Sequence, residues 1–208
     1  MKISGSFLSS KNIPKDLEKL NDTDIDYIHV DVMDGKFTEN RTMPFSEMRH
    51  ISDYTSKRLD VHLMVKEPSK YIPMYAELNC EYITFHIESS EDINKNIDLI
   101  KGYSIKCGLA ISPDTKISSL IPYLPDIDLI LVMSVVPGRG EQEFIEKTSD
   151  RIKEIRELID EYKLNIVINV DGGINDKTKE KCNSADILTS GSYIIKSNNF
   201  QEKISSLR

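Results

Sequence analysis

Hydrophobic residues along this chain gather in short runs rich in β-branched side chains, and longer charged stretches separate the runs. We expect a strand in each of eight runs, at residues 2–8, 27–34, 58–65, 82–88, 106–112, 128–136, 165–173 and 185–194. The charged stretches fit amphipathic helices. The clearest is 144–163, where apolar residues recur near helical spacing at Ile145, Ile152, Ile155, Leu158 and Ile159. Strands that alternate with helices predict βαβ units and a parallel sheet.

The number of repeats favours an α/β fold of the (β/α)8 type, a TIM barrel. Eight such units in 208 residues lie at the lower end of the length range of these barrels. A doubly wound open sheet is the rival fold, but it usually has fewer strands and a glycine-rich first turn, whereas the first turn here reads GSFLSS. Because no linker or low-complexity segment divides the sequence, we expect residues 1–208 to form a single barrel domain.

Charge and composition restrict the classes of partner. The formal net charge of −7 argues against nucleic acid, because binding to a phosphate backbone needs a basic surface. The sequence has no run of eighteen apolar residues that predicts a membrane span, and the apolar part of its first segment is too short for a signal peptide. Cys80, Cys107 and Cys182 are widely spaced, so we expect reduced thiols in a cytoplasmic protein.

Polar residues on three of the predicted strands point toward one place. In a barrel, alternate residues of each strand point inward, and active-site groups lie at the carboxyl ends of the strands. The residues that share an inward face are His29, Asp31 and Met33 in the second run, Asp60, His62 and Met64 in the third, and Asn169 and Asp171 in the seventh. An unpaired charge in a core is costly, so buried carboxylates need a partner, a metal or a function.

Taken singly, each polar residue also has a structural interpretation. A core histidine such as His29 is often only a hydrogen-bonded structural residue. We interpret Asp34, in the turn MDG, as a cap of the turn after the second run, and His50 as a solvated residue. His86 and Glu88 share a face of the fourth run, and we expect them to support the site rather than form it.

The joint pattern of two histidines and two aspartates is harder to explain as structure alone. His29, Asp31, His62 and Asp171 lie on strands whose ends meet in the mouth of a barrel. They form a mixed nitrogen and oxygen donor set that suits Zn²⁺, Fe²⁺, Mn²⁺ or Co²⁺. A purely structural zinc site is disfavoured because the set contains no cysteine. We therefore predict one divalent metal ion at this place.

Eight segments together match one known family in its own order, over nearly the whole chain. They are KISGSFLSS, HVDVMDGKF, DVHLMV, ITFHIE, GLAISPDT, LVMSVVPGRGEQEF, VDGGI and SGSYI. The combination of H-x-D-x-M-D-G, D-x-H-x-M-V and V-D-G-G is specific, and with it the chain resembles the ribulose-phosphate 3-epimerases. The resemblance implies a barrel of the ribulose-phosphate-binding type. It also implies a homo-oligomer of the pentose phosphate pathway that interconverts D-ribulose 5-phosphate and D-xylulose 5-phosphate, with metal ligands at His29, Asp31, His62 and Asp171.

The implied reaction inverts a carbon next to a carbonyl group. A proton leaves one face and another returns to the opposite face, through an enediolate whose negative charge a divalent metal stabilises. Two carboxylates, one on each side of the substrate plane, supply the base and the acid. We expect Asp31 to remove the C3 proton of ribulose 5-phosphate and protonated Asp171 to deliver one, with the roles exchanged in the reverse direction.

The resemblance also places residues against the reacting carbons. Met33, Met64 and Met133 are expected there, where an apolar surface would exclude water, although filling of the core is the alternative role for each. Ser6 matches a substrate-contacting serine of the family, and we expect His62 to contact the substrate as well.

The phosphate group of such a substrate needs donors, and the sequence has no P-loop. We expect them from the ends of the seventh and eighth strands, where barrels commonly bind phosphate, at Gly172, Gly173, Gly191 and Ser192. Glycines that merely shape turns are the alternative.

The loop after the sixth run departs from the family pattern V-[N/E]-P-G-F-G-G-Q. It reads VVPGRGEQ, with Val136 in place of a polar residue, Arg139 in place of Phe and Glu141 in place of Gly. We expect this loop, including Gly138 and Gly140, to close over the substrate. Arg139 is expected to pair with the phosphate. Glu141 would repel a phosphate, so we expect it to pair with Arg139 or to point to solvent.

Two alternatives stay open. A hexulose phosphate 3-epimerase acting on D-allulose 6-phosphate would use the same metal and carboxylates on a substrate that is longer by one carbon. A paralogue that binds a sugar phosphate without turnover is the other, since a fold alone does not fix function. Phosphate-binding barrels that work without a metal are disfavoured, because they do not need His29 and His62 on matching strand faces.

Overall fold

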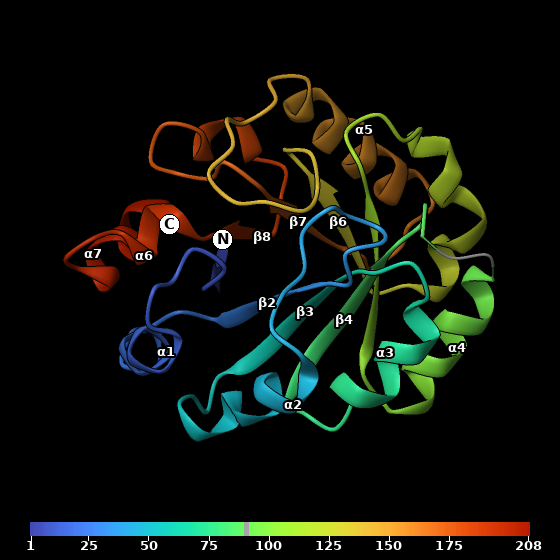
Figure 1. Cartoon of the computed structure of the whole chain (residues 1–208). Helices are drawn as coiled ribbons and strands as arrows, with labels where there is room; N and C mark the ends of the chain where they lie inside the picture. The colour runs from blue at the N-terminus through green and yellow to red at the C-terminus, as the bar shows by residue number, and fades with distance from the viewer. Residues whose placement is uncertain (90–91) are drawn as a thin grey trace.

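The predicted strands form a closed parallel barrel in a computed structural model, which describes residues 1–89 and 92–208. The described residues hold eight strands that neighbour one another in chain order (Figure 1). They are β1 (Lys2–Ser6), β2 (Tyr27–Met33), β3 (Arg58–Met64), β4 (Cys80–His86), β5 (Lys106–Ile111), β6 (Leu129–Met133), β7 (Val167–Asp171) and β8 (Ile187–Ser190). The ring closes where β1 pairs with β8, from Lys2 opposite Ile187 to Gly5 opposite Ser190. The barrel prediction is confirmed, and the open sheet is excluded.

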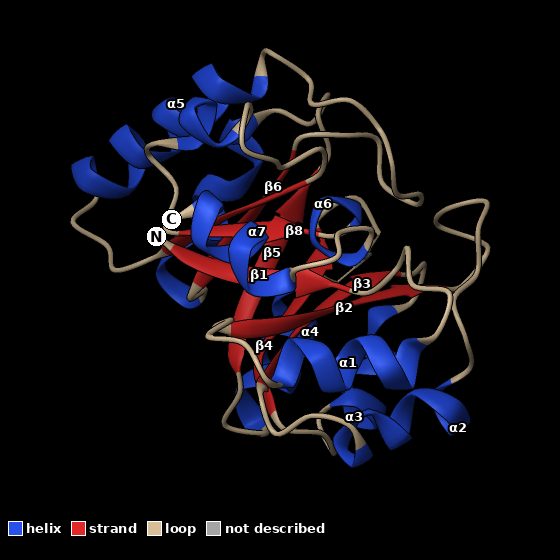
Figure 2. Ribbon diagram, turned by 90° about the vertical axis from the view of Figure 1, so that its left-hand side faces the viewer, coloured by secondary structure: helices blue, strands red, loops and turns tan. Residues whose placement is uncertain are grey.

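Helices surround the strands, as Figure 2 shows with helices in blue around strands in red. Their apolar faces explain this position: α1 buries Leu17 and Leu20, and α4 buries Ile97 and Ile100. The α-helices are α1 (Ile13–Asn21), α2 (Phe45–Met48), α3 (Pro68–Tyr75), α4 (Ile93–Gly102), α5 (Thr148–Glu161), α6 (Ser192–Ile195) and α7 (Phe200–Leu207). Short 3-10 helices are η1 (Arg49–Asp53), η2 (Ile117–Asp126) and η3 (Lys179–Cys182).

The helix expected over 144–163 is shorter than predicted at its start. Helix α5 begins at Thr148 and buries Ile152, Ile155 and Ile159, as the periodicity indicates. Ile145 lies outside it, because its backbone N–H donates to Ser134 O at 2.8 Å and ties this segment to the end of β6. The preceding residues therefore belong to a long loop that reaches the mouth of the barrel.

The barrel is apolar at one end and polar toward the other. Tyr27, Leu129 and Ile187 lie at the end at which β2, β6 and β8 begin, in an apolar cluster that continues along β6 to Met133 and Val135. All residues of β2 are buried, as expected for a parallel strand covered by helices. Buried polar side chains begin at the middle of the strands, with Ser4, Asp60 and Asn169, and continue to the end where the strands finish.

Strand register brings the predicted site residues to matching levels. Between β2 and β3, Asp31 lies opposite His62 and Met33 lies opposite Met64. Between β6 and β7, Met133 lies opposite Asp171. The alternating inward residues of these strands therefore meet in layers at the carboxyl ends.

Cys80, Cys107 and Cys182 are buried and free. In the part of the chain that the structure describes, the helices are too short or too polar to cross a lipid bilayer.

Candidate active site

Four side chains from three strands meet at the carboxyl ends of β2, β3 and β7. They are the predicted metal ligands His29, Asp31, His62 and Asp171, and one donor atom from each lies within 4.8 Å of the others. His29 Nε2 and His62 Nδ1 each lie 3.4 Å from Asp31 Oδ1 and 3.6 Å from Asp171 Oδ2. Ligand atoms that share one metal ion at about 2.0–2.2 Å stand roughly 3–4 Å apart. The spacing therefore suits a single ion.

The two imidazole atoms that face this cluster are orphaned. Within residues 1–89 and 92–208, His29 Nε2 and His62 Nδ1 are buried and have no hydrogen-bond partner. A buried polar atom without a partner costs free energy, so it calls for a ligand. Imidazole nitrogen beside carboxylate oxygen is a donor set for Zn²⁺, Fe²⁺, Mn²⁺ or Co²⁺, and the four residues fit a divalent ion.

A carboxylate on β3 fixes the ring of His29. Asp60, which is 1% exposed, accepts from Ser4 Oγ at 2.9 Å and Asn169 Nδ2 at 3.1 Å, and its Oδ2 lies 2.8 Å from His29 Nδ1. An ionised carboxylate only accepts hydrogen bonds, so the proton of His29 is on Nδ1. Nε2 is therefore the ring atom that would give its lone pair to a cation bound at the cluster. The sequence places Asp60 on the inward face, but it gave no signal for this pairing.

A second chain of hydrogen bonds fixes the ring of His62. His62 Nε2 lies 2.9 Å from His86 Nε2, and His86 Nδ1 lies 3.0 Å from Glu88 Oε2. Burial lowers the pKa of His86 to about 4, so its ring is neutral and carries its proton on Nδ1, toward Glu88. His62 must donate from Nε2, so Nδ1 is the ring atom that would give its lone pair to a cation bound at the cluster. His86 and Glu88 thus stand behind a predicted ligand, in the supporting position we expected.

The buried charges control the pKa values at the cluster. Burial alone would lower the pKa of His29, but the carboxylates of Asp60 and Asp31 outweigh it and raise this pKa well above its usual value. Burial would raise the pKa of Asp31, yet His29 and His62 hold it far below its usual range. The same negative field that favours a protonated imidazole attracts a divalent cation.

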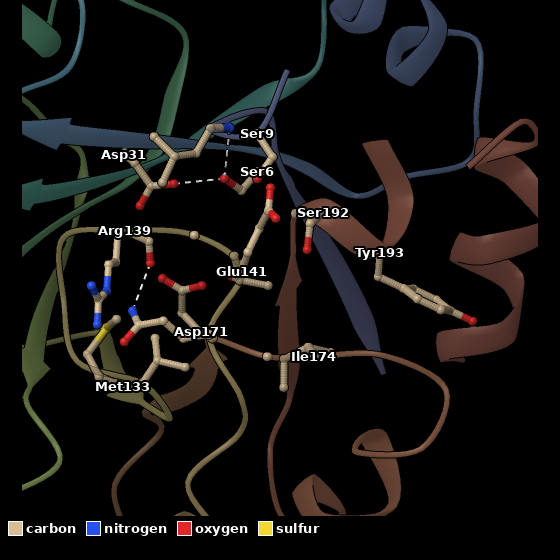
Figure 3. A pocket seen from close by; sticks show the side chains of 18 of the residues that line it. Ser6, Ser9, Asp31, Met133, Arg139, Glu141, Asp171, Ile174, Ser192 and Tyr193 are labelled. Carbon is tan, nitrogen blue, oxygen red and sulfur yellow. Dashed lines mark hydrogen bonds between the residues drawn. The ribbon is translucent and has the colours of Figure 1, made fainter. Parts of the chain in front are cut away.

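A cavity of about 390 Å³ adjoins the cluster (Figure 3). Its size lies within the range of small-molecule sites. The predicted substrate-binding residues that line it are Ser6, Met64, Met133, Gly138, Arg139, Gly140, Glu141, Asp171, Gly172, Gly173, Gly191 and Ser192. Asp31 also lines it, whereas His29, His62 and Met33 lie outside the lining. The two histidines are fully buried, so among the four predicted ligands the aspartates are the ones that reach the cavity.

A serine on β1 orients one of these aspartates. Ser6 Oγ donates to Asp31 Oδ2 at 2.7 Å and accepts from Leu8 N at 3.2 Å (Figure 3). The other oxygen of Asp31 faces the two imidazoles. Asp31 therefore has one oxygen held by Ser6 and one directed at the cluster.

The glycines after β7 have structural reasons of their own. Gly172 has φ +118° and Gly173 has φ +64°, both in the left-handed region that glycine adopts freely. A Cβ on Gly172 would lie 2.4 Å from Val135 Cγ2, and one on Gly173 would lie 2.7 Å from Phe144 N. The turn and its packing both require glycine here, and a role in phosphate binding stays a prediction.

The loop of residues 134–147 extends from β6 over the cavity. Gln142 Nε2 donates to Val136 O at 2.7 Å and to Arg139 O at 2.8 Å, and the second of these bonds is drawn in Figure 3. Asn40 Nδ2, from the loop after β2, donates to Gly138 O at 2.8 Å. The side-chain amides of Gln142 and Asn40 therefore hold backbone carbonyls of this loop in place.

Glu141 pairs with a partner that the sequence did not indicate. Its Oε1 lies 2.7 Å from Lys196 Nζ, at the end of α6, rather than beside Arg139. The expectation of a pair with Arg139 is therefore wrong, while the expected contact with solvent holds in part, since the Glu141 side chain is 54% exposed. Lys196 lines the same cavity and is a site residue that our reading of the sequence missed.

Fold and site together define a class of protein: a (β/α)8 barrel with a buried histidine–aspartate cluster beside a cavity at the carboxyl ends of its strands. The model of the ribulose-phosphate 3 epimerase family matches residues 2–195. A ribulose-phosphate 3-epimerase of Bacillus subtilis (strain 168) is 35% identical over 99% of this chain and 95% of its own length. One of Buchnera aphidicola subsp. Baizongia pistaciae is 39% identical over 99% and 93%. The chain belongs to the ribulose-phosphate 3-epimerase family and is therefore an isomerase.

Solved structures at lower identity support the fold alone. KGPDC from Streptococcus mutans superimposes with a TM-score of 0.73 at 12% identity, covering 99% of this chain and 94% of that one. The 3-hexulose-6-phosphate synthase from Salmonella typhimurium gives a TM-score of 0.68 at 16% identity, covering 100% and 96%. These barrels share the architecture, and a shared fold does not carry function.

Proposed function

We propose that this chain is a metal-dependent epimerase that interconverts D-ribulose 5-phosphate and D-xylulose 5-phosphate. Family membership supplies the reaction class. The observation that carries the proposal is the pair of carboxylates, Asp31 and Asp171, which reach one cavity from β2 and β7 and share two buried imidazoles. Inversion at a carbon beside a carbonyl needs two such groups, one for each face.

The residues that would hold the metal are His29, His62, Asp31 and Asp171. When bound, a divalent ion supplies Lewis-acid stabilisation of the negative charge of an enediolate. The donor set suits zinc, iron, manganese or cobalt, and we propose one ion of this group. Asp60 and His86 hold the two imidazoles in the tautomers that leave a lone pair for it.

The two aspartates move the protons. Asp31 is ionised, because its imidazole neighbours hold its pKa far below its usual range, and Ser6 fixes the orientation of its carboxylate. We assign to Asp31 the removal of the C3 proton of ribulose 5-phosphate. Asp171, in its protonated form, delivers a proton to the other face of C3. The reverse reaction exchanges the two roles, as expected for a pair of coupled carboxyl groups.

Other lining residues would fix and shield the substrate. Met64 and Met133 line the cavity and would exclude water from the enediolate, while Met33 lies at the level of Met64 outside the lining. The phosphate would lie against the ends of β7 and β8 and the loop after β6. The residues proposed to contact it are Gly138, Arg139, Gly140, Gly172, Gly173, Gly191 and Ser192, while Glu141 lines the same end of the cavity without binding the phosphate.

We further propose one catalytic domain over residues 1–208, a homo-oligomer and a cytoplasmic location. The ring uses both the first and the last strand, from Lys2 to Ser190, which supports a single domain. Three buried free cysteines suit a reducing compartment. Self-association rests on the family resemblance.

Exchange of the C3 proton tests the proposal. Purified protein is mixed with ribulose 5-phosphate in D₂O and followed by proton NMR, before and after chelation. We expect loss of the C3 proton signal and formation of xylulose 5-phosphate, abolished by chelation and restored by Zn²⁺, Fe²⁺, Mn²⁺ or Co²⁺. No exchange in a folded, metal-loaded sample would overturn the proposal. A higher kcat/KM with D-allulose 6-phosphate in a parallel assay would move it to the longer substrate.

A further inference from the structure

The ion pair of Glu141 and Lys196 bridges the rim of the cavity. Glu141 belongs to the loop after β6, and Lys196 follows α6, which comes after β8. Since β7 lies between β6 and β8 in the ring, the pair spans the side of the barrel that holds the turn at Gly172 and Gly173. Both side chains line the cavity with that turn. The pair therefore lies at the end of the cavity where we place the phosphate.

The backbone at Glu141 is held in an unusual conformation. Its φ of +62° lies in the left-handed region, which is unfavourable for a residue with a side chain. The neighbouring Gln142 is fixed by two hydrogen bonds to loop carbonyls. A Cβ on Gly140 would lie 3.1 Å from Ser9 Oγ, so the loop also packs against the segment after β1. These contacts of the loop therefore fix the backbone from which the Glu141 side chain extends.

Lys196 is fixed at its own base. Its N–H donates to Ser192 O at 3.1 Å, which places it one turn after the Gly191–Ser192 step in the cavity lining. Ile194 and Ile195, just before it, are buried and anchor the turn. The lysine side chain itself is 55% exposed, so its ammonium group keeps the freedom to change partners.

We propose that Lys196 binds the phosphate group of the substrate, and that Glu141 occupies this lysine in the ligand-free enzyme. The inference rests on the proposed function, which brings a phosphorylated sugar into this cavity. An ion pair between two half-exposed side chains is weak. A hydrogen bond from an ammonium group to a phosphate dianion is stronger, so the dianion takes Lys196 from Glu141.

Release of Glu141 completes the exchange. A carboxylate left beside a bound phosphate would repel it, and the Glu141 side chain already has access to solvent into which it can turn. Arg139, in the same loop, lines the cavity and adds a second cation. The arrangement selects for a doubly charged ligand, because an unphosphorylated sugar has no charge with which to displace Glu141.

Charge-neutralising variants at the two positions test the exchange. We expect Lys196→Gln to raise the KM for ribulose 5-phosphate and the inhibition constant of inorganic phosphate by about fivefold to tenfold, with kcat changed less than about twofold. Lys196→Arg should stay close to the wild type. Glu141→Gln should lower both constants by about twofold to threefold, and this gain should vanish in the Lys196→Gln background.

The affinity for inorganic phosphate, measured by calorimetry, tests this inference separately from the proposed function, because binding of phosphate requires no turnover. Weaker phosphate binding by Lys196→Gln supports the phosphate role of Lys196 even if ribulose 5-phosphate is not the substrate. A matched control is Glu146→Gln, which removes an ion pair with Lys181 from the same loop at residues outside the cavity lining. It should leave every constant unchanged. Unchanged phosphate binding in Lys196→Gln, or weaker binding in Glu141→Gln, would overturn the inference.

Discussion

The two histidines at the cluster present different ring atoms, Nε2 from His29 and Nδ1 from His62. The difference originates one contact away from the cluster. Asp60 accepts a hydrogen bond from His29 Nδ1–H, whereas His86 accepts one from His62 Nε2–H. Each supporting side chain thereby chooses the tautomer of the ligand in front of it. At the scale of single residues, the geometry of the cluster depends on these four side chains as much as on the aspartates.

Asp60→Asn should lower the affinity of the cluster for a metal ion, although Asp60 is not one of the proposed ligands. The carboxamide loses the negative charge that faces His29 Nδ1, so the imidazole becomes a poorer donor. We expect metal affinity to fall by roughly 10- to 100-fold, measured by competition with a chromophoric chelator. Asp53→Asn is the matched control, since it changes the same kind of carboxylate–histidine contact at the exposed His50. Equal affinity of folded Asp60→Asn and wild type would contradict the role of Asp60.

Asp171→Asn should separate proton exchange from inversion. Asp31 remains able to take the C3 proton of ribulose 5-phosphate and return deuterium to the same face, while the amide has no proton to deliver to the other face. We expect NMR in D₂O to show exchange at C3 with xylulose 5-phosphate formation reduced by about 10²–10⁴-fold. Asp31→Asn should reverse the pattern, with exchange surviving in xylulose 5-phosphate. Near-normal epimerisation by Asp171→Asn would refute the two-aspartate scheme.

Single residues also mark the limit of prediction from sequence. The meeting of the four residues of the cluster was predictable, because alternation along a strand shows which residues face inward. The pairing of Asp60 with His29 was not, since it depends on the register between β2 and β3. The contact of Glu141 with Lys196 joins a loop to a short helix far along the chain. Local pattern carries no information about such a contact, because packing of the whole barrel sets the distance.

At the scale of elements, Asp34 joins the ends of two neighbouring strands. Its Oδ1 accepts from the backbone N–H of Lys36 and Phe37 in the turn after β2, and its Oδ2 accepts from Lys66 N just after β3. The interpretation of Asp34 as a turn cap is confirmed. The hydrogen bond to Lys66 N, just after β3, is a further contact that the interpretation did not include. The site residues Asp31 and His62 lie shortly before these tied ends, so the tie helps to hold their strands in step.

Asp34→Asn should destabilise the fold, because an amide can accept on one side only and leaves the N–H of Lys66 facing another donor. We expect the free energy of unfolding to fall by about 1–3 kcal/mol at pH 7 in urea titrations. Asp98→Asn, an exposed change on α4, serves as the control and should have no effect. A variant as stable as wild type would show that the tie to β3 contributes nothing.

The same side chain gives the stability a defined pH dependence. Burial would raise the pKa of Asp34, but the backbone donors outweigh it, and the pKa is lowered in the folded protein. A carboxyl whose pKa is lower when folded stabilises the fold above its unfolded pKa, near 4. That contribution disappears as the pH falls through the lowered value. The stability difference between wild type and Asp34→Asn should therefore shrink in acid, and a constant difference would contradict this account.

Elements differ in how far the sequence predicts them. Each strand was predicted from a β-branched run, because a strand buried on both faces is apolar along its length. The predicted start of α5 was wrong. The backbone N–H of Ile145 donates to Ser134 O at the end of β6, so residues before Thr148 do not join the helix. The segment Ile117–Asp126 folds as a 3-10 helix with Pro122 and Pro125 inside it, a form that periodicity alone does not indicate.

At the scale of the whole molecule, the proposed metal ligands come from strands on separate parts of the ring, β2 and β3 on one side and β7 on another. A site of this kind exists only in the folded barrel, so metal binding stabilises it by mass action. At a metal concentration about 100 times Kd we expect roughly 2.7 kcal/mol, which raises the Tm by about 5–10 °C for a chain of this size.

Calorimetry of chelator-treated protein, with and without added Zn²⁺ or Mn²⁺, measures this shift. A His62→Gln variant should lose most of it, because one of the four donors is then absent. Equal Tm values with and without metal in the wild type would show that the four side chains do not bind the ion.

The pairing of β1 with β8 has a consequence for how the chain is made. Among the described strands of the ring, β1 is synthesised first and its partner β8 (Ile187–Ser190) is synthesised last. At about 5–20 residues per second, β1 waits roughly ten to forty seconds with an unpaired edge. An open edge is a template on which other nascent chains can add strands. We therefore expect strand addition by other nascent chains to compete with closure of the ring during this interval.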